Sequence, residues 1–151
     1  MQMKRISPKW IAGLAAALIF GVAVSAENSI HRAAHQGDVA QLQVLLTQKG
    51  IDVNARDSFG GTALHAAMFQ KNIKVVELLL NAGFDVNAVG PRNGYTPLHD
   101  AVWANNVPAA QLLLAKGART DIKGKDGMTP YEKAVKEGKT EIARVLQGAR
   151  R

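Results

Sequence analysis

A six-residue word recurs along this 151-residue chain at an almost constant interval. Residues 96–101 read TPLHDA, residues 62–67 read TALHAA, and residues 129–134 read TPYEKA. A more divergent copy, NSIHRA, occupies residues 28–33. A fixed period of 33 or 34 residues indicates one supersecondary unit repeated along the chain. Such units must stack, because none can bury its apolar face alone.

Each copy of the word carries the signals of a helix start. Thr62 is suited to cap a helix with its hydroxyl, and Pro97 and Pro130 fit the first helical position, where a missing N–H costs nothing. A second apolar run follows each word, as in IKVVELLL at residues 73–80, and Gly83 stands where a left-handed residue ends a helix. Each unit is therefore predicted to fold as turn, short helix, turn, longer helix and return loop.

The word and its period resemble the ankyrin repeat, and the chain is similar to a small exported bacterial ankyrin-repeat protein. The resemblance implies an all-α repeat solenoid of four stacked helix-turn-helix units with protruding β-turn loops. The expected domain spans 27–151, with units at about 28–57, 58–90, 91–123 and 124–151. The first and last units are expected to act as caps, because their words diverge most and a terminal unit has one face in water.

The first 26 residues have the composition of a secretory leader. Three basic side chains lie within residues 1–9, and an uninterrupted apolar run of 15 residues follows from Trp10 to Val24. This run is shorter than the roughly 20 residues that a membrane-spanning helix needs. We expect a Sec-type signal peptide at 1–26, cleaved after Ala26, and a periplasmic protein. The alternative is an uncleaved leader that anchors the protein in the inner membrane, facing the periplasm.

Charge and cysteine content exclude several functions. The chain has 19 Lys and Arg against 12 Asp and Glu, a formal charge of +7, and three of the basic residues lie in the leader. The remaining excess is too small for a nucleic-acid-binding footprint. The absence of cysteine excludes disulfides, thiol catalysis and Cys-based zinc sites. His31 and His35 have a spacing that can chelate a metal, but no further ligands lie nearby, so neither a metal nor a cofactor is expected.

The histidine of the word is expected to be structural rather than catalytic. The resemblance implies that it hydrogen-bonds turn backbone across the stack, at His31, His65 and His99. The helix-capping threonines are structural too: Thr62, Thr96 and Thr129. Asp100 follows His99, but adjacent helical residues do not face each other, so Asp100 is expected to be solvated or bonded to the next turn. With no GxSxG nucleophile and no phosphate-binding glycine loop, the sequence does not indicate an enzyme.

Ankyrin proteins bind partners through a concave stripe of turn tips and exposed first-helix faces, and the resemblance assigns such a stripe here. The predicted partner-binding residues are Phe59, Phe69, Arg92, Tyr95, Trp103 and Met128. Four of the six aromatic residues after the leader fall on this stripe, and aromatic and arginine side chains dominate interface energetics. The alternative is that Phe69 and Trp103 pack on neighbouring units as local stacking.

These features favour a monomeric, non-enzymatic protein-binding module. It would dock one partner protein on its concave face and support or inhibit that partner outside the cytoplasm. Two alternatives stay open: a membrane-anchored structural or tethering protein with an uncleaved leader, and an immunity protein that neutralises a toxin. The sequence does not identify the partner, and nucleic acid is not expected to be one.

Overall fold

A computed structural model describes residues 30–149, which fold as pairs of helices joined by loops, without a strand in that range. The predicted signal peptide at 1–26 and its cleavage site lie outside the described residues. The predicted all-α repeat solenoid is confirmed. The helices are residues 30–36, α2 (Val39–Leu46), α3 (Ala63–Ala66) with the 3₁₀ turn η1 (Ala67–Phe69), α4 (Ile73–Asn81), α5 (Pro97–Trp103), α6 (Val107–Ala115), α7 (Pro130–Lys136) and α8 (Thr140–Ala149).

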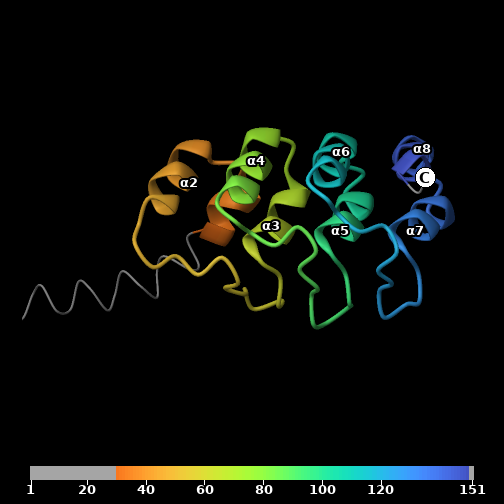
Figure 1. Cartoon of the computed structure of the whole chain (residues 1–151), viewed down its shortest axis with the longest axis horizontal. Coiled ribbons are helices and arrows are strands. Elements are labelled where there is room, and N and C mark those ends of the chain that lie inside the picture. Colours follow the sequence, from red (N-terminus) through yellow and green to blue (C-terminus); the bar gives the residue numbers. More distant parts are fainter. Residues whose placement is uncertain (1–29, 150–151) are drawn as a thin grey trace, which may run out of the picture.

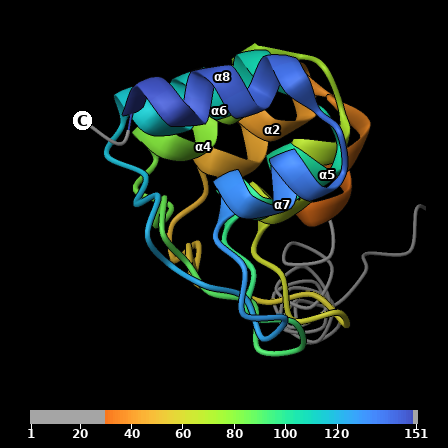
Figure 2. The ribbon, with the colours of Figure 1, turned by 90° about the vertical axis from the view of Figure 1, so that its right-hand side faces the viewer.

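The helices form two layers that run along the stack (Figure 1). The second helices of the pairs, α2, α4, α6 and α8, follow one another in one layer, and α3, α5 and α7 follow one another in the other. The loops that lead into α3, α5 and α7 project together to one side, as the view along the stack shows (Figure 2). The first helices and these loops therefore present their side chains to a common surface.

The helices α3, α5 and α7 begin after the predicted threonines, whose amides are bonded by the side chain three residues later. The Thr96 N–H donates to His99 Nδ1 over 3.2 Å, and the same contact joins Thr62 to His65 over 3.1 Å. In α7 the reciprocal box is formed with a carboxylate, because Glu132 Oε2 accepts from the Thr129 N–H at 2.8 Å. These contacts satisfy amide groups that a helix start leaves without an intrahelical partner.

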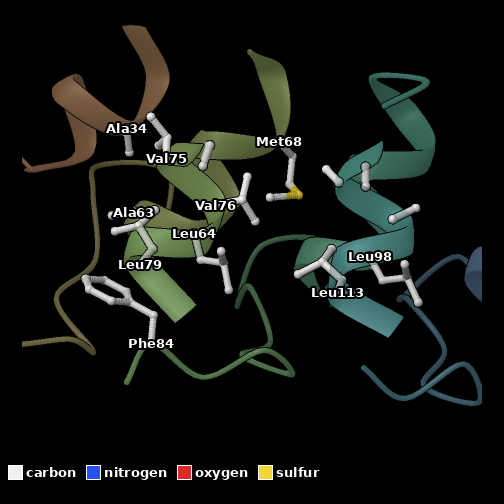
Figure 3. Close-up of a cluster of buried hydrophobic side chains, with 14 of the residues drawn as sticks. Ala34, Ala63, Leu64, Met68, Val75, Val76, Leu79, Phe84, Leu98 and Leu113 are labelled. Carbon is white, nitrogen blue, oxygen red and sulfur yellow. The ribbon is translucent and has the colours of Figure 1, made fainter. Parts of the chain in front are cut away.

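The apolar faces of both layers form one continuous core (Figure 3). Leu64 of α3, Leu79 of α4 and Leu98 of α5 are fully buried and lie between successive pairs. Fully burying a side chain of this kind contributes roughly 1.5–3 kcal/mol. Because each pair supplies the apolar surface that its neighbours cover, stability comes from stacking rather than from any single pair.

The projecting loops are joined to one another by hydrogen bonds. Arg56 Nη1 donates to the carbonyl of Val89 at 2.9 Å, and the Lys125 N–H donates to the carbonyl of Asn93 at 2.8 Å. Gly60 has a φ of 83°, and a Cβ placed there would lie 2.7 Å from the Pro91 ring. A glycine is therefore required where two successive loops approach this closely. The loops form a fixed wall beside the first helices.

Candidate functional site

A groove of about 710 Å³ lies between the first helices and the projecting loops. Helix 30–36, α3, η1 and α5 form one side, and the loops around residues 57–61 and 90–93 form the other. The lining combines aromatic rings with a few charged and polar groups: His31, His35, Asp57, Phe59, Gly61, His65, Ala66, Phe69, Gly90, Arg92, Asn93, Asp100 and Trp103. Clefts of this size with mostly apolar walls and few polar groups are typical of binding sites.

A row of three rings crosses successive units along the groove. His35, Phe69 and Trp103 each stand four residues after the histidine of their word, so the repeat places them in register. The ring centroids of His35 and Phe69 are 6.4 Å apart, and those of Phe69 and Trp103 are 5.8 Å apart in an edge-to-face arrangement. Although these rings contact each other, the Phe69 side chain stays 44% exposed and that of Trp103 58% exposed. Local stacking therefore occurs, but it leaves large apolar faces open to a ligand.

The following unit fixes the backbone that carries each of these two rings. Asn106 Nδ2 donates to the carbonyls of Met68 at 3.0 Å and Gln70 at 2.8 Å, which flank Phe69. Lys139 Nζ donates to the carbonyl of Trp103 itself at 2.6 Å. The ring faces are thus exposed while the backbone beneath them is fixed. This lowers the conformational entropy that is lost when a partner binds.

The opposite wall of the groove carries Phe59 and Arg92. Phe59 stands at a loop tip, 69% exposed, and the Arg92 guanidinium lies 5.6 Å from its ring centroid. Asp57 shapes this tip, because its Oδ1 accepts from the N–H groups of Phe59 at 2.9 Å and Gly61 at 3.0 Å. This carboxylate is used by the turn, whereas Phe59 and Arg92 are presented to the groove.

Asp100 lines the groove and is buried there, whereas the sequence predicts a solvated or hydrogen-bonded side chain. Its side chain is only 7% exposed, and the described residues supply neither a hydrogen bond nor an ion pair to its carboxylate. Burial raises the pKa of the Asp100 carboxyl from 3.8 to about 7, because a charge is costly where little water reaches it. The prediction that Asp100 is solvated or bonded to the next turn was wrong: the residue is buried, and its side chain makes no hydrogen bond to the next turn among the described residues.

The histidines of the word form a ladder between units. Nε2 of His31, His65 and His99 lies 3.2 Å from the carbonyls of Gly61, Tyr95 and Met128 respectively. In His65 and His99 the Nδ1 accepts from a threonine N–H, so Nε2 carries the proton of a neutral ring and donates it to the next unit. Burial lowers the pKa of both rings and keeps them neutral. Both nitrogens are occupied by structural bonds, which leaves neither for proton transfer.

Two of the predicted partner-binding residues lie apart from the groove. Tyr95 is half-buried, stacks on His99 with centroids 5.0 Å apart, and donates its hydroxyl to Asp126 Oδ2 over 2.7 Å. Lys133 Nζ lies 4.7 Å from the Tyr95 ring centroid and 3.1 Å from the same Asp126 oxygen. Met128 is half-buried and its carbonyl accepts from His99. Phe59, Phe69, Arg92 and Trp103 are brought together, while Tyr95 and Met128 join the contacts between the last two pairs.

Residues 30–149 lack two other kinds of feature. That range contains no cluster of three or more His, Cys, Asp or Glu side chains placed to hold a metal ion. It also has no helix that combines the length and apolar character required to cross a membrane.

The comparison with known proteins agrees with the repeated helical pairs. A family model described as ankyrin repeats (3 copies) matches residues 30–124, more than half of the chain. The protein belongs to the ankyrin-repeat family. Ankyrin repeats are generally protein-binding modules, and they are typically non-catalytic.

Individual relatives match this ankyrin protein over part of its length. The palmitoyltransferase akr1 of Schizosaccharomyces pombe is 43% identical over 63 residues, which are 42% of this chain and 10% of the yeast protein. The ankyrin repeat domain-containing protein 29 of Danio rerio is 37% identical over 60 residues, 40% of this chain and 20% of the fish protein. The mitochondrial disaggregase of Bos taurus is 41% identical over 63 residues, 42% of this chain and 9% of that protein. The chain thus covers a fifth or less of these relatives, and the likeness is to their repeat regions.

Proposed function

We propose that this ankyrin protein docks one partner protein in the groove, without catalysis, and acts outside the cytoplasm. The observation that carries the proposal is the pair of rings of Phe69 and Trp103, which stay exposed on a backbone that neighbouring units hold in place. Exposed aromatic rings in a concave site are the common anchors of protein interfaces. The general role of ankyrin repeats as protein-binding modules supports the same reading.

A pull-down experiment compares two double variants of the full chain. Each variant carries a C-terminal tag and is produced in the native host cells. Phe69→Ala with Trp103→Ala removes the exposed rings of the groove, whereas Val44→Ala with Val135→Ala removes exposed apolar side chains outside it. Both pairs lie at the surface, so far-UV circular dichroism and melting temperature should change little. We expect the groove variant to lose capture of a partner that the wild type and the control variant retain. Equal capture by all three proteins would refute the proposal.

The proposed location rests on the leader at 1–26, with its basic start and its 15-residue apolar run. We propose export by the Sec route, cleavage after Ala26 and a periplasmic mature protein. Mass spectrometry of the protein from fractionated cells tests this. A mature N-terminus at Glu27 in the periplasmic fraction is expected, and a protein beginning at Met1 in the membrane fraction would contradict cleavage and favour the anchored alternative.

Support and inhibition of the partner are distinguished once the partner is captured. The partner's activity or lifetime is measured with the wild type and with the groove variant. A loss of activity on addition of the wild type alone identifies an inhibitor, and a gain in activity or lifetime identifies a supporting protein.

A further inference from the structure

The groove contains a carboxylate that residues 30–149 leave without a partner. Asp100 is a buried residue, 7% exposed, whose carboxylate oxygens open to the groove, and residues 30–149 offer this carboxylate no hydrogen bond and no ion pair. A buried carboxylate of this kind costs free energy that a hydrogen-bonded cation recovers. A group with such a cost on the wall of a groove favours a ligand over a contribution to folding.

Two basic side chains, Lys133 and Arg92, contact groups other than Asp100. Lys133 occupies the position equivalent to Asp100 in the following unit, and its Nζ lies 3.1 Å from Asp126 and 3.5 Å from Glu137. Arg92 lines the groove, but its guanidinium lies over Phe59. The described residues therefore do not neutralise Asp100, and its carboxylate is open to a cation that enters the groove.

The walls around Asp100 suit a long basic side chain. Trp103 stands one helical turn after Asp100 on α5, so the two side chains share a face of that helix. Ala66, at the equivalent position of the preceding unit, has only a methyl group and leaves space beside the carboxylate. The rings of Phe69 and Trp103 offer faces on which a methylene stem packs and a cation is attracted.

We propose that the groove recognises its protein partner through one arginine or lysine side chain, which passes along the rings of Phe69 and Trp103 and places its cation on the Asp100 carboxylate. This assignment rests on the proposed function, because it names the chemistry of the partner that docks in the same groove. A partner held by apolar contacts alone would not require Asp100.

The test uses random short peptides displayed on phage and selected against the immobilised full chain at pH 8. The most enriched peptide is synthesised with a fluorophore, and its basic residue is replaced by a neutral isostere, citrulline for arginine or acetyl-lysine for lysine. The protein variants are Asp100→Asn, which removes the charge at constant size, and Val44→Ala as the surface control. We expect either neutralisation to weaken binding at least tenfold, since a charge-assisted pair is worth about 1.5 kcal/mol or more. Neutralising both should weaken it little further.

The alternative results have distinct meanings. Equal binding of the peptide by wild type and Asp100→Asn, with binding lost in Phe69→Ala/Trp103→Ala, overturns the cationic contact but keeps the proposed groove. Peptide binding that is unchanged in all of these variants overturns both. Self-association of the wild type that Asp100→Asn abolishes, measured by sedimentation, overturns the assignment to a partner and makes the occupant a second copy.

A measurement on the unmodified protein keeps the proposal testable if Asp100→Asn fails to fold. The carboxyl pKa of Asp100 is followed by ¹³C NMR, with the peptide and with its neutral isostere. The basic peptide should lower that pKa by at least about one unit, because the bound cation favours the carboxylate. Equal pKa values with both peptides would overturn the proposal. The other titratable and charged groups of the groove, which must be followed as controls, are His31, His35, Asp57, His65 and Arg92.

Discussion

Replacing Asp100 by asparagine should stabilise the folded protein at alkaline pH and have little effect at acid pH. The substitution keeps the size of the side chain and removes its charge. In the folded state burial raises the carboxyl pKa from 3.8 to about 7, and the side chain has no compensating bond among the described residues. The wild type therefore loses free energy of unfolding when this group ionises, whereas the variant has no such cost.

The magnitude follows from linkage. A rise of about three pKa units corresponds to about 4 kcal/mol at 1.36 kcal/mol per unit. Because the folded pKa is raised, the contribution of Asp100 is most favourable below pH 3.8 and is lost as pH rises to about 7. The stability advantage of Asp100→Asn should thus grow between those values and level off above the folded pKa. Relaxation of the groove and entry of water would reduce the plateau, so an advantage of about 2–4 kcal/mol is expected at pH 8.

The assay is urea unfolding of both proteins, followed by far-UV circular dichroism at pH 4.5, 6, 7 and 8. The lowered pKa values of His65 and His99 also make stability depend on pH, but they are present in both proteins and cancel in the difference. A difference that stays constant with pH, or an Asp100→Asn protein less stable than wild type at pH 8, would refute the argument that an unpaired buried carboxylate occupies the groove.

Three further predictions concern the scaffold. Leu98→Ala, at a fully buried position, should lower the free energy of unfolding by about 2–5 kcal/mol in urea titrations, and a loss below about 1 kcal/mol would show that the stack closes around the gap. Burial lowers the pKa of His65 and His99 in the folded state, so their contribution to the free energy of unfolding is present above pH 6.5 and lost as pH falls below it. The melting temperature of His99→Gln should therefore depend less steeply on pH below 6.5 than that of the wild type. An equally steep dependence in both proteins would contradict this. Tyr95→Phe, which removes the 2.7 Å bond to Asp126, should cost about 1 kcal/mol in urea unfolding and leave partner capture intact, whereas loss of capture would return Tyr95 to the binding surface.

The local chemistry of the fold could be predicted from the sequence because the signals are local and repeated. The threonine cap, the proline after it and the histidine three residues later all act within one helical turn, and their period fixes how units align. The same period put Phe69 and Trp103 at equivalent positions, which is why both rings lie on one groove.

Asp100 and Tyr95 show what the repeat pattern does not reveal. That Asp100 does not face His99 follows from helix geometry, but its burial depends on how the units stack in three dimensions. Tyr95 was assigned to the contact stripe from its position, yet its hydroxyl bonds Asp126, 31 residues further along the chain. Such contacts depend on the side chains of another unit, and the repeated sequence motif does not specify which side chains those are.

Site-specific photo-crosslinking in the cells that encode the protein tests the central claim most directly. Benzoylphenylalanine is placed at Trp103 in the groove or at Val44, an exposed position outside it, in otherwise unchanged full-length chains. The structure predicts one discrete crosslinked partner from position 103, reduced by the added substitution Asp100→Asn, and none from position 44. A partner crosslinked equally from both positions, or from position 44 alone, would contradict docking in the groove.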